Sequence, residues 1–257
     1  MNDTPEHIHS FLDQKFLSFN HPAFIETDPI QVPALFTTKE NIEIAGFLAA
    51  TLAWGQRPTI IRNALSIIRQ MGNNPLEFLL HTPEEEWIRF ADFKHRTFNG
   101  IDCQYFLKSL RNVYLNHGGL ETVFTRGFQE DQTIFSALVH FRKVFFELEH
   151  ERRTEKHVSN VVKGAAAKRL NMFLRWMTRS DHLGVDFGLW KQIPSSALML
   201  PLDVHTGNVA RKLGLLTRTQ NDWKAVEEIT AKLREFDPED PIKYDFALFG
   251  LGVFEKF

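Results

Sequence analysis

The sequence predicts an all-α fold, and three observations support this prediction. Apolar residues recur at helical spacing in segment after segment of the 257-residue chain. No run of alternating apolar and polar residues, the pattern of a half-buried β-strand, competes with them. Helix start and stop residues stand at the ends of these segments. We therefore expect about ten helices that form a single domain over residues 1–257, or two lobes sharing one core.

Four segments show the helical period most clearly, because their apolar residues lie three or four positions apart and would share one face. A fifth segment, from Ile42 to Trp54, is apolar almost all round, which predicts a helix buried on most of its faces. The residues of the four periodic segments are Ile60, Ala64, Ile68 and Met71; Phe106, Leu110 and Val113; Phe135, Leu138, Phe141 and Phe145; and Trp223, Val226, Ile229 and Leu233.

Proline, glycine and capping residues predict where helices begin and end. Thr4-Pro5 and Asn74-Pro75 each combine a capping residue with a proline in the first turn, and Gly72 favours a helix end near Met71. The sequence Gly55-Gln56-Arg57-Pro58 should end one helix and begin the next. The stretch from Ser180 to Pro201 is the longest expected loop, and its aromatic residues indicate that it packs against the core.

The composition is that of a globular protein, with 43% hydrophobic and 24% charged residues. No apolar stretch approaches the roughly 18 residues of a membrane-spanning helix, and no positively charged start leads into an apolar run. The single cysteine, Cys103, cannot form an internal disulfide or hold a metal centre alone. We therefore expect a cytoplasmic monomer with no membrane contact, no obligate protein partner, no metal and no other cofactor.

Positive charge is concentrated in one part of the sequence, although the formal net charge is −2. Residues 1–50 hold seven Asp and Glu against two Lys, whereas residues 151–179 hold eight Lys and Arg against two Glu. Such a run is consistent with a solvated helix face and also with a surface that binds phosphate. If it binds phosphate, Arg152, Arg153 and Arg175 are expected on the wall that faces the DNA backbone.

The first block with chemical interest is Val162–Leu170, between an expected upstream helix and an amphipathic run of Leu170, Phe173, Leu174 and Met177. A tight turn before a helix exposes backbone N–H groups and the positive end of the helix dipole, which together suit a phosphate. Glycine and alanine between helices are also typical of close packing. We define residues 160–178 as the expected hairpin and its following helix.

The second block, Pro201–Leu215, places Asp203 directly before a short amphipathic helix. An aspartate in this position is typical of an N-cap, whose carboxylate accepts backbone N–H groups. The same carboxylate is also a candidate catalytic group. His205 follows in the first turn and is either a proton shuttle or a packing residue. We define residues 201–215 as the catalytic aspartate segment.

Together the two blocks resemble the helix-hairpin-helix DNA glycosylase superfamily. In that superfamily the hairpin runs Leu-Pro-Gly-x-Gly-x-Lys, and Gly164, Ala166 and Lys168 take the Gly, Gly and Lys places. The second signature runs Val-Asp-x-His-Val-x-Arg-Val-x-x-Arg-Leu-Gly, and its aspartate is catalytic. The residues on or beside that signature are Leu202, Asp203, His205, Val209, Arg211, Leu213 and Gly214.

A third part of the resemblance is the segment Leu48–Thr59, where a Gln-containing turn follows a buried helix and would bring Gln56 near the lesion. The chain departs from the pattern at Ala166, which replaces a glycine that often has positive φ, and in lacking the Leu-Pro. Lys168 lies 35 positions before Asp203, further than is usual in the superfamily, and in this longer separation the chain resembles the archaeal 8-oxoguanine glycosylase branch. The whole chain is similar to a bacterial family recorded as a domain of unknown function.

The resemblance implies a two-lobed helical fold and a base-excision repair N-glycosylase with AP lyase activity on double-stranded DNA. The enzyme would excise a damaged base, with an oxidised purine as the candidate that the archaeal branch suggests. Lys168 would attack the sugar as a free amine and Asp203 would assist. A monovalent cation would sit in the hairpin, and no cofactor would take part in the chemistry. The implied DNA-binding residues are Gln56, Lys163, Gly164, Ala166, Arg169, Arg175 and His205.

Two other functions remain open from the sequence. The chain is also consistent with a DNA-binding protein that keeps the fold without the chemistry. It is equally consistent with a helical protein unrelated to nucleic acid, in which Lys168 is a surface residue and Asp203 a cap. If a base is flipped out of the duplex, Trp54, Trp176 and Trp190 are the candidates to stack on it.

Overall fold

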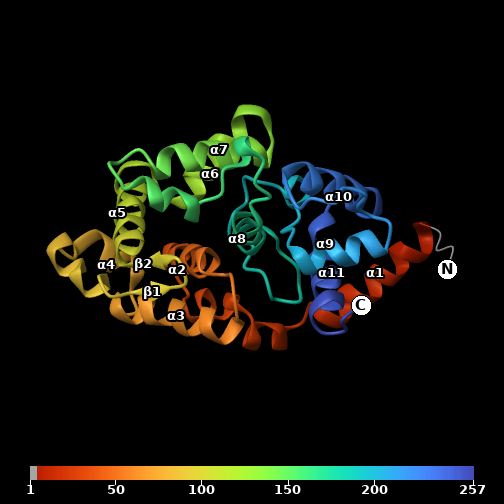
Figure 1. The fold of residues 1–257 in the computed structure, drawn as a ribbon, viewed down its shortest axis with the longest axis horizontal. Coiled ribbons are helices and arrows are strands. Elements are labelled where there is room, and N and C mark those ends of the chain that lie inside the picture. Colours follow the sequence, from red (N-terminus) through yellow and green to blue (C-terminus); the bar gives the residue numbers. More distant parts are fainter. Residues whose placement is uncertain (1–4) are drawn as a thin grey trace. The chain divides into compact units, whose positions relative to one another are not determined.

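The computed structural model describes residues 5–257, and helices dominate this part of the chain, which confirms the all-α prediction (Figure 1). Its one sheet is a hairpin of two-residue strands, β1 (Lys94–His95) and β2 (Phe98–Asn99). The α-helices are α1 (Pro5–Phe19), α2 (Lys39–Thr51), α3 (Arg57–Gln70), α4 (Pro75–His81), α5 (Gly100–Asn116), α6 (Leu120–Asp131), α7 (Ile134–Phe145), α8 (Lys168–Thr178), α9 (Val204–Lys212), α10 (Trp223–Phe236) and α11 (Tyr244–Val253).

The chain divides into two compact units. The terminal unit consists of Met1–Phe24 and Val161–Phe257, so it contains both ends of the chain. The middle unit consists of Ile25–Asn160. Lys168 and Asp203 both belong to the terminal unit, whereas Gln56 belongs to the middle unit.

The middle unit is built around α2, whose residues from Ile42 to Thr51 are all buried, as predicted from its apolar sequence. Helices α3 and α4 pack against it, and α6 and α7 lie side by side (Figure 1). Phe47, Phe106 and Phe145 meet in the core with ring centroids 4.8 to 6.0 Å apart. The buried helix α2 and the predicted apolar faces of α5 and α7 therefore meet in one aromatic core.

The structure confirms the helix end predicted near Gly72 and the helix start predicted at Pro75, both in the middle unit. Helix α3 ends at Gln70, and Gly72 follows with φ +68°, a backbone conformation that favours glycine. Helix α4 begins at Pro75, although the side chain of Asn74 makes no capping hydrogen bond. Thr4, the other predicted cap, lies outside the described residues.

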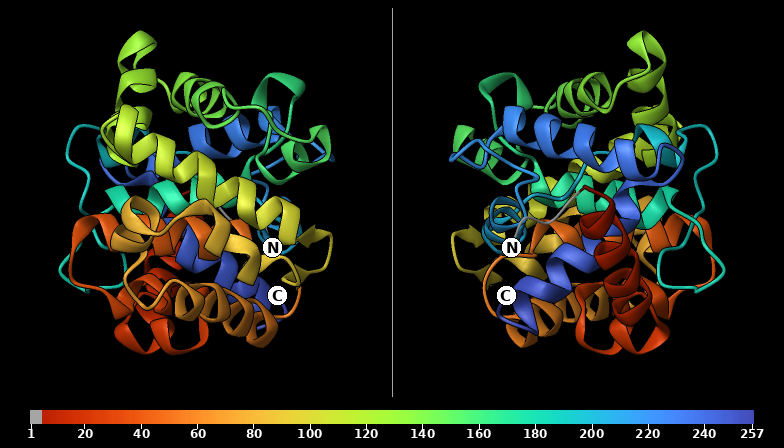
Figure 2. Two further views of the ribbon diagram at one scale, coloured as in Figure 1. Left: turned by 90° about the vertical axis from the view of Figure 1, so that its left-hand side faces the viewer. Right: turned by 90° about the vertical axis from the view of Figure 1, so that its right-hand side faces the viewer.

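In the terminal unit, α1 lies alongside α11, and the right-hand view of Figure 2 shows the two helices side by side. Gly250 makes this approach possible, because an added Cβ would lie 2.2 Å from the ring of Phe19. Helix α11 also packs against α9, where Gly252 faces the backbone of His205. These contacts fix the start of α9, and with it Asp203, relative to α11.

Helix α8 differs from its expected amphipathic pattern, because every residue from Leu170 to Thr178 is buried. The polar face that the sequence indicated includes Arg175, which is only 4% exposed. The predicted loop after this helix, 180–201, packs at the helix end. The backbone N–H groups of Phe187 and Trp190 donate to the carbonyls of Trp176 and Met177, at 2.8 and 2.9 Å.

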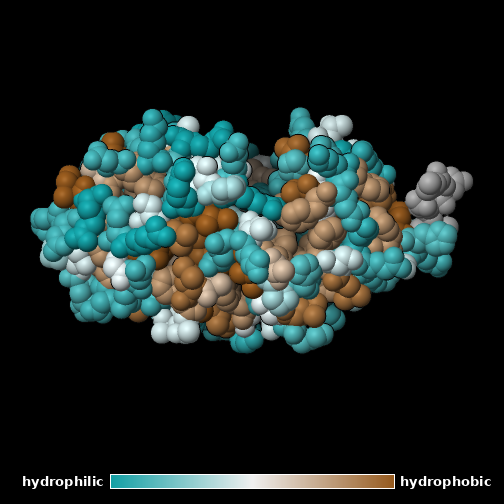
Figure 3. Space-filling model, turned by 90° about the horizontal axis from the view of Figure 1, so that it is seen from below, coloured by the Kyte–Doolittle hydropathy of each residue, from teal (hydrophilic) through white to brown (hydrophobic). Residues whose placement is uncertain are grey.

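Hydrophobic side chains on the surface are scattered. One face, seen in Figure 3, carries hydrophilic residues with hydrophobic ones between them. Exposed large apolar residues come from separate elements, among them Leu17 in α1, Leu115 in α5 and Val204 in α9. Single exposed apolar residues are normal for folded proteins. Within residues 5–257, each helix is too short or too polar to span a bilayer.

Candidate active site

The predicted hairpin is a loop, Gly164–Ala167, that leads directly into α8. Positive φ angles occur at Gly164 (+83°) and Ala167 (+49°), and Ala166 is not among the residues with positive φ. The left-handed conformation that the family pattern leads one to expect at Ala166 therefore falls one residue later. Nothing lies within 4 Å of a Cβ added to Gly164, so its backbone angle, and not crowding, favours glycine there.

The segment before the hairpin corrects one sequence prediction. We expected an α-helix upstream, but the chain there forms two short 3-10 helices, η5 (Arg152–His157) and η6 (Val161–Lys163). The last α-helix before them, α7, ends at Phe145. Short 3-10 helices commonly serve as connectors between other elements.

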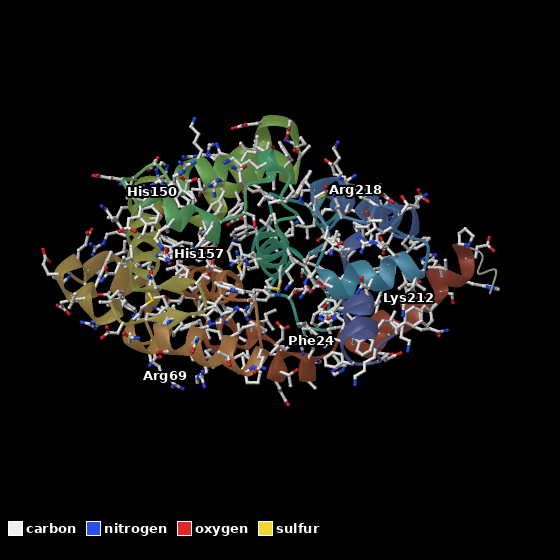
Figure 4. All side chains as sticks on the ribbon, in the orientation of Figure 1. Phe24, Arg69, His150, His157, Lys212 and Arg218 are labelled. Carbon is white, nitrogen blue, oxygen red and sulfur yellow. The ribbon has the colours of Figure 1, made fainter. Side chains whose placement is uncertain are left out.

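The hairpin loop is held by the segment Asn221–Trp223, which begins α10. The backbone N–H of Trp223 donates to the carbonyl of Gly164 at 2.9 Å, and Ala165 forms an isolated bridge with Asp222. Asp222 caps α10 and pairs with Arg218, which is labelled in Figure 4. On the other side, the Asn171 side chain donates to the carbonyl of Ala166 at 3.2 Å. The loop is therefore fixed from both sides.

Lys168 is the first residue of α8 and is half-buried. Its Nζ lies 3.6 Å from the sulfur of Met172, one helical turn further along. The N-cap residue, Ala167, has no side chain that could bond the first N–H groups of the helix. The amine of Lys168 thus lies against an apolar side chain. It also lies at a helix start whose first N–H groups have no side-chain cap.

Asp203 is the N-cap of α9, which confirms the N-cap interpretation. Its Oδ1 accepts the backbone N–H of Thr206 at 2.9 Å. Its backbone carbonyl accepts the side-chain amide of Asn221 at 3.0 Å. The carboxylate itself is half-exposed. A capping bond occupies one of its oxygens, so the role of a cap does not exclude a second role.

Two features join the hairpin block to the aspartate block. The first is the segment Asn221–Trp223. Trp223 donates its backbone N–H to the carbonyl of Gly164 in the hairpin loop, and Asn221 donates its side-chain amide to the carbonyl of Asp203. The second is Asp245 in α11, which is 5% exposed. Burial raises the pKa of Asp245 to about 6, and the positive charges of Arg175 and Lys168 oppose this rise while Asp203 adds to it. The hydrogen bonds of Asn221–Trp223 therefore hold both blocks within the terminal unit.

Arg175 belongs to a buried network of ion pairs and not to a DNA-facing surface. Its Nε lies 3.2 Å from Asp186 Oδ1, and its Nη1 donates to Asp245. Arg179, one turn later, lies 3.1 Å from the other oxygen of Asp186 and 3.0 Å from Asp240. Burial raises the pKa of Asp186, although both guanidinium groups oppose it. A phosphate contact by Arg175, as the sequence analysis expected, conflicts with this burial.

We expect Arg175→Ala to destabilise the protein by about 3–5 kcal/mol, because it leaves Asp186 and Asp245 buried with one fewer cationic partner. Chemical denaturation monitored by circular dichroism measures this loss. Lys163→Ala, which removes one exposed cation, is the matched control and should change the free energy of unfolding by less than about 0.5 kcal/mol. Equal stability of the two variants would contradict the structural role of Arg175.

The basic segment 151–179 does not form one continuous positive surface, which corrects a second expectation. Arg153 lies 2.8 Å from the buried Asp102, and Arg175 and Arg179 are buried with aspartates. Burial lowers the pKa of the half-buried Arg169 guanidinium to about 10. The exposed cations of the segment are Arg152, Lys156 and Lys163.

Gln56, in the middle unit, is exposed at the N-cap position of α3, and its side chain makes no capping hydrogen bond. The turn before it is held by Trp54, whose carbonyl lies 3.2 Å from His95 Nε2 and whose ring packs edge-on against the same imidazole. His157, labelled in Figure 4, stacks near Trp54 and lies 3.2 Å from Asp102. The turn that presents Gln56 is therefore anchored by buried groups.

The remaining predicted residues differ in their access to solvent. His205 is exposed in the first turn of α9. Of the candidate stacking residues, Trp176 and Trp190 are 0% and 1% exposed, so neither offers a ring face to a base. Trp54 is half-buried. Among residues 5–257, no three His, Cys, Asp or Glu side chains are grouped as metal ligands.

Three residues of the site were missed by the sequence analysis: Asn171, Asn221 and Asp245. Asp245 had a detectable signal, because it is the one acidic residue in the otherwise apolar helix Tyr244–Val253. A charge in such a helix needs a partner in the core. Asn171 and Asn221 gave no comparable signal, since asparagines are common in turns and on surfaces.

The chain belongs to the family described as a protein of unknown function (DUF2400), which it matches over residues 28–254. The match confirms the similarity of the whole chain to a family without an assigned function. It covers the hairpin block, the aspartate block and Asp245. No curated protein and no solved structure matches the chain.

Proposed function

We propose that this protein is a DNA N-glycosylase with AP lyase activity that excises a damaged base from double-stranded DNA in the cytoplasm. Lys168 is the nucleophile and Asp203 the carboxylate that balances the positive sugar. One observation carries the proposal. Lys168 and Asp203 lie 35 positions apart in sequence, yet the segment Asn221–Trp223 donates hydrogen bonds both to the loop that leads into Lys168 and to the backbone carbonyl of Asp203. One structural element therefore supports the lysine and the carboxylate that the proposed chemistry needs.

The chemistry follows from the demands of an N-glycosidic bond. The free amine of Lys168 attacks C1′ of a flipped nucleotide, and the bond from C1′ to the base breaks. The electron pair leaves with the base, which takes up a proton. Loss of a proton from the amine nitrogen and opening of the C1′–O4′ bond onto a protonated O4′ then give an imine. Removal of a C2′ proton expels the 3′ phosphate and nicks the strand.

The start of α8 is the proposed contact with the DNA backbone. Its first N–H groups have no side-chain cap, and a phosphate oxygen would accept them. Lys163 and Arg169 flank this helix start, and Gly164 and Ala166 allow the backbone to come close. Gln56 and His205 are proposed contacts near the lesion, and the buried Arg175 is left out of the contact surface.

Borohydride trapping tests the proposal. The protein is incubated with duplexes that carry an oxidised purine, an abasic site or no lesion, and sodium borohydride reduces any imine to a stable adduct. A covalent protein–DNA adduct on a lesion duplex supports the proposal. Salt-dependent DNA binding without an adduct indicates a DNA-binding protein that lacks the chemistry, and absence of binding at low salt rules out both.

One observation favours a second candidate, a helical protein unrelated to nucleic acid. Asp203 makes the capping bond to Thr206 that a purely structural aspartate would make. This candidate gives no role to the amine of Lys168. It predicts that the protein binds DNA no more tightly than an unrelated protein with the same net charge of −2.

If DNA binds, we expect Arg152→Ala and Lys163→Ala each to reduce the slope of log affinity against log salt by about 1, because each removes one exposed cation. Base preference should hardly change, since phosphate contacts position the protein without reading sequence. Fluorescence anisotropy at several salt concentrations measures the slope. Lys232→Ala, which removes an exposed lysine of α10 outside the basic segment, is the matched control. An unchanged slope in both test variants would exclude these cations from the interface.

A further inference from the structure

Helix α3 and the β1–β2 hairpin of the middle unit carry positive charge that is not balanced nearby in sequence. Residues 44–76 contain three arginines and no aspartate or glutamate, and residues 93–99 contain one lysine and one arginine and no acidic residue. Four of these cations are exposed, and within the described chain none of the four side chains has a hydrogen bond or an ion pair. We define these four residues, Arg62, Arg69, Lys94 and Arg96, as the α3 surface.

Arg62 and Arg69 lie on one face of α3. They are seven positions apart, close to two full turns, so their side chains leave the helix in nearly the same direction, about 10 Å apart along its axis. Arg69 is labelled in Figure 4. The opposite face of the helix is apolar and buried, which leaves the arginine face to solvent. The buried residues of that face are Ile60, Ala64, Ile67 and Ile68.

Buried contacts hold the hairpin beside the start of α3. The ring of His95 reaches both neighbours, because its Nδ1 lies 2.9 Å from the side-chain nitrogen of Asn63 and its Nε2 lies 3.2 Å from the carbonyl oxygen of Trp54. Arg96 lies over the turn before α3, since a Cβ added to Gly55 would be 3.2 Å from its Nη1. The hairpin tip and α3 therefore belong to one surface of the middle unit.

The backbone of Arg96 adopts a conformation that arginine disfavours. Its φ is +53°, in the left-handed region that glycine, asparagine and aspartate occupy more readily. Arg96 is the first of the two residues that join β1 to β2, a position where a glycine or asparagine is common. The turn itself therefore does not account for an arginine. A side chain on a strained backbone at an exposed tip indicates a function for that side chain.

The composition of the α3 surface favours a phosphate backbone as its partner. Among residues 5–257, no large apolar side chain of α3 or of the hairpin is exposed. A helix that binds a membrane inserts apolar side chains between lipids, and a protein interface buries an apolar centre, so both partners need such residues. Guanidinium groups bind phosphate oxygens through paired N–H groups and need no apolar contact. The surface therefore suits a nucleic acid.

We propose that the α3 surface binds the phosphate backbone of duplex DNA and gives this protein a second DNA contact, on the middle unit. The choice of DNA rests on the proposed function, whose contacts at the start of α8 do not include this surface. Each phosphate that the four cations neutralise releases counterions, so log affinity falls steeply with log salt. The surface positions the duplex and does not read its bases.

We expect Arg62→Ala/Arg69→Ala to reduce the slope of log affinity against log salt for an undamaged duplex by about 2, because it removes two phosphate contacts. Fluorescence anisotropy at several salt concentrations measures the slope. Arg126→Ala/Lys143→Ala is the matched control, since it removes two exposed cations of α6 and α7, which lie across the middle unit from α3 (Figure 1). The control should keep the wild-type slope. Equal slopes in wild type and Arg62→Ala/Arg69→Ala would overturn the inference.

Arg96→Gly separates the charge of the hairpin tip from its fold. Glycine adopts the positive φ of this position without strain, so the melting temperature should stay the same or rise. The salt slope should nevertheless fall by about 1, because one phosphate contact is lost. Arg96→Lys should keep the slope, since it keeps the charge. A wild-type slope in Arg96→Gly would exclude the hairpin tip from the DNA contact.

Binding to an undamaged duplex is measured separately from borohydride trapping, so the α3 surface and the proposed function fail in different ways. A slope reduced in Arg62→Ala/Arg69→Ala, with no trapping by wild type on any lesion duplex, supports the surface and contradicts the glycosylase chemistry. An unchanged slope with normal trapping contradicts the surface alone. Vesicles of phosphatidylglycerol test the membrane alternative. Wild-type binding to the vesicles that exceeds binding to DNA, and that the double variant loses, would overturn the inference.

Discussion

Lys168→Gln is expected to abolish borohydride trapping on every lesion duplex and to leave DNA affinity within about tenfold of wild type. The variant removes the amine that forms the imine, whereas a single cation supplies a small share of the electrostatic binding energy. Glutamine is one atom shorter than lysine and keeps a polar, uncharged group at this position. Trapping by gel electrophoresis and affinity by fluorescence anisotropy should be measured on the same preparation.

Lys163→Gln is the matched control for this prediction. Lys163 is exposed, lies five positions earlier at the end of η6, and carries the same charge. Its replacement should weaken binding about as much as replacement of Lys168, and trapping at saturating protein should persist. Full trapping by Lys168→Gln would remove this lysine from the mechanism. Loss of trapping in both variants would indicate that binding, and not the amine, limits adduct formation.

The helices were predictable because their signals are local. Apolar spacing and a nearby stop residue are enough to place α3, and Gly72 needs no distant partner to end it. The cap of α9 was predictable for the same reason, since Asp203 bonds a backbone N–H only three residues away. Both features depend on neighbours within one or two turns, which a sequence displays directly.

The charges were not predictable because their partners are distant in sequence. Arg175 and Arg179 looked like part of a basic surface, but their partners Asp245 and Asp240 lie 70 and 61 positions away. Once paired, each guanidinium sits in the core, where a phosphate does not reach it. A run of basic residues therefore indicates a surface only where no buried carboxylate pairs with it.

The hairpin lies between these two cases. Its location before α8 was evident from Gly164 and the following helix, but short 3-10 helices precede it, and its second left-handed residue is Ala167 and not Ala166, which takes the family's glycine place. The position of a left-handed residue depends on the contacts that hold the loop, here with Trp223 and Asn171. A superfamily motif carries the residue types of a turn, whereas neighbours elsewhere in the chain decide which residue adopts the positive φ.

Asp203→Asn separates a catalytic carboxylate from a cap. Asparagine accepts the N–H of Thr206 about as well as aspartate, so the free energy of unfolding should change by at most about 1 kcal/mol. Base release should nevertheless fall by about 10²–10³-fold, because a neutral amide does not balance the cationic sugar in a site from which water is excluded. Single-turnover kinetics and chemical denaturation measure the two effects.

The control for Asp203→Asn is another capping aspartate of the same unit. Asp222 caps α10 by accepting the N–H of Ala225 at 3.1 Å, and its charge pairs with Arg218 and not with Lys168. Asp222→Asn should keep base release near the wild-type rate even if it costs some stability. Equal rates in the two variants would leave Asp203 as a cap alone. A slow Asp203→Asn variant of normal stability would show that its carboxylate has a chemical role besides its structural one.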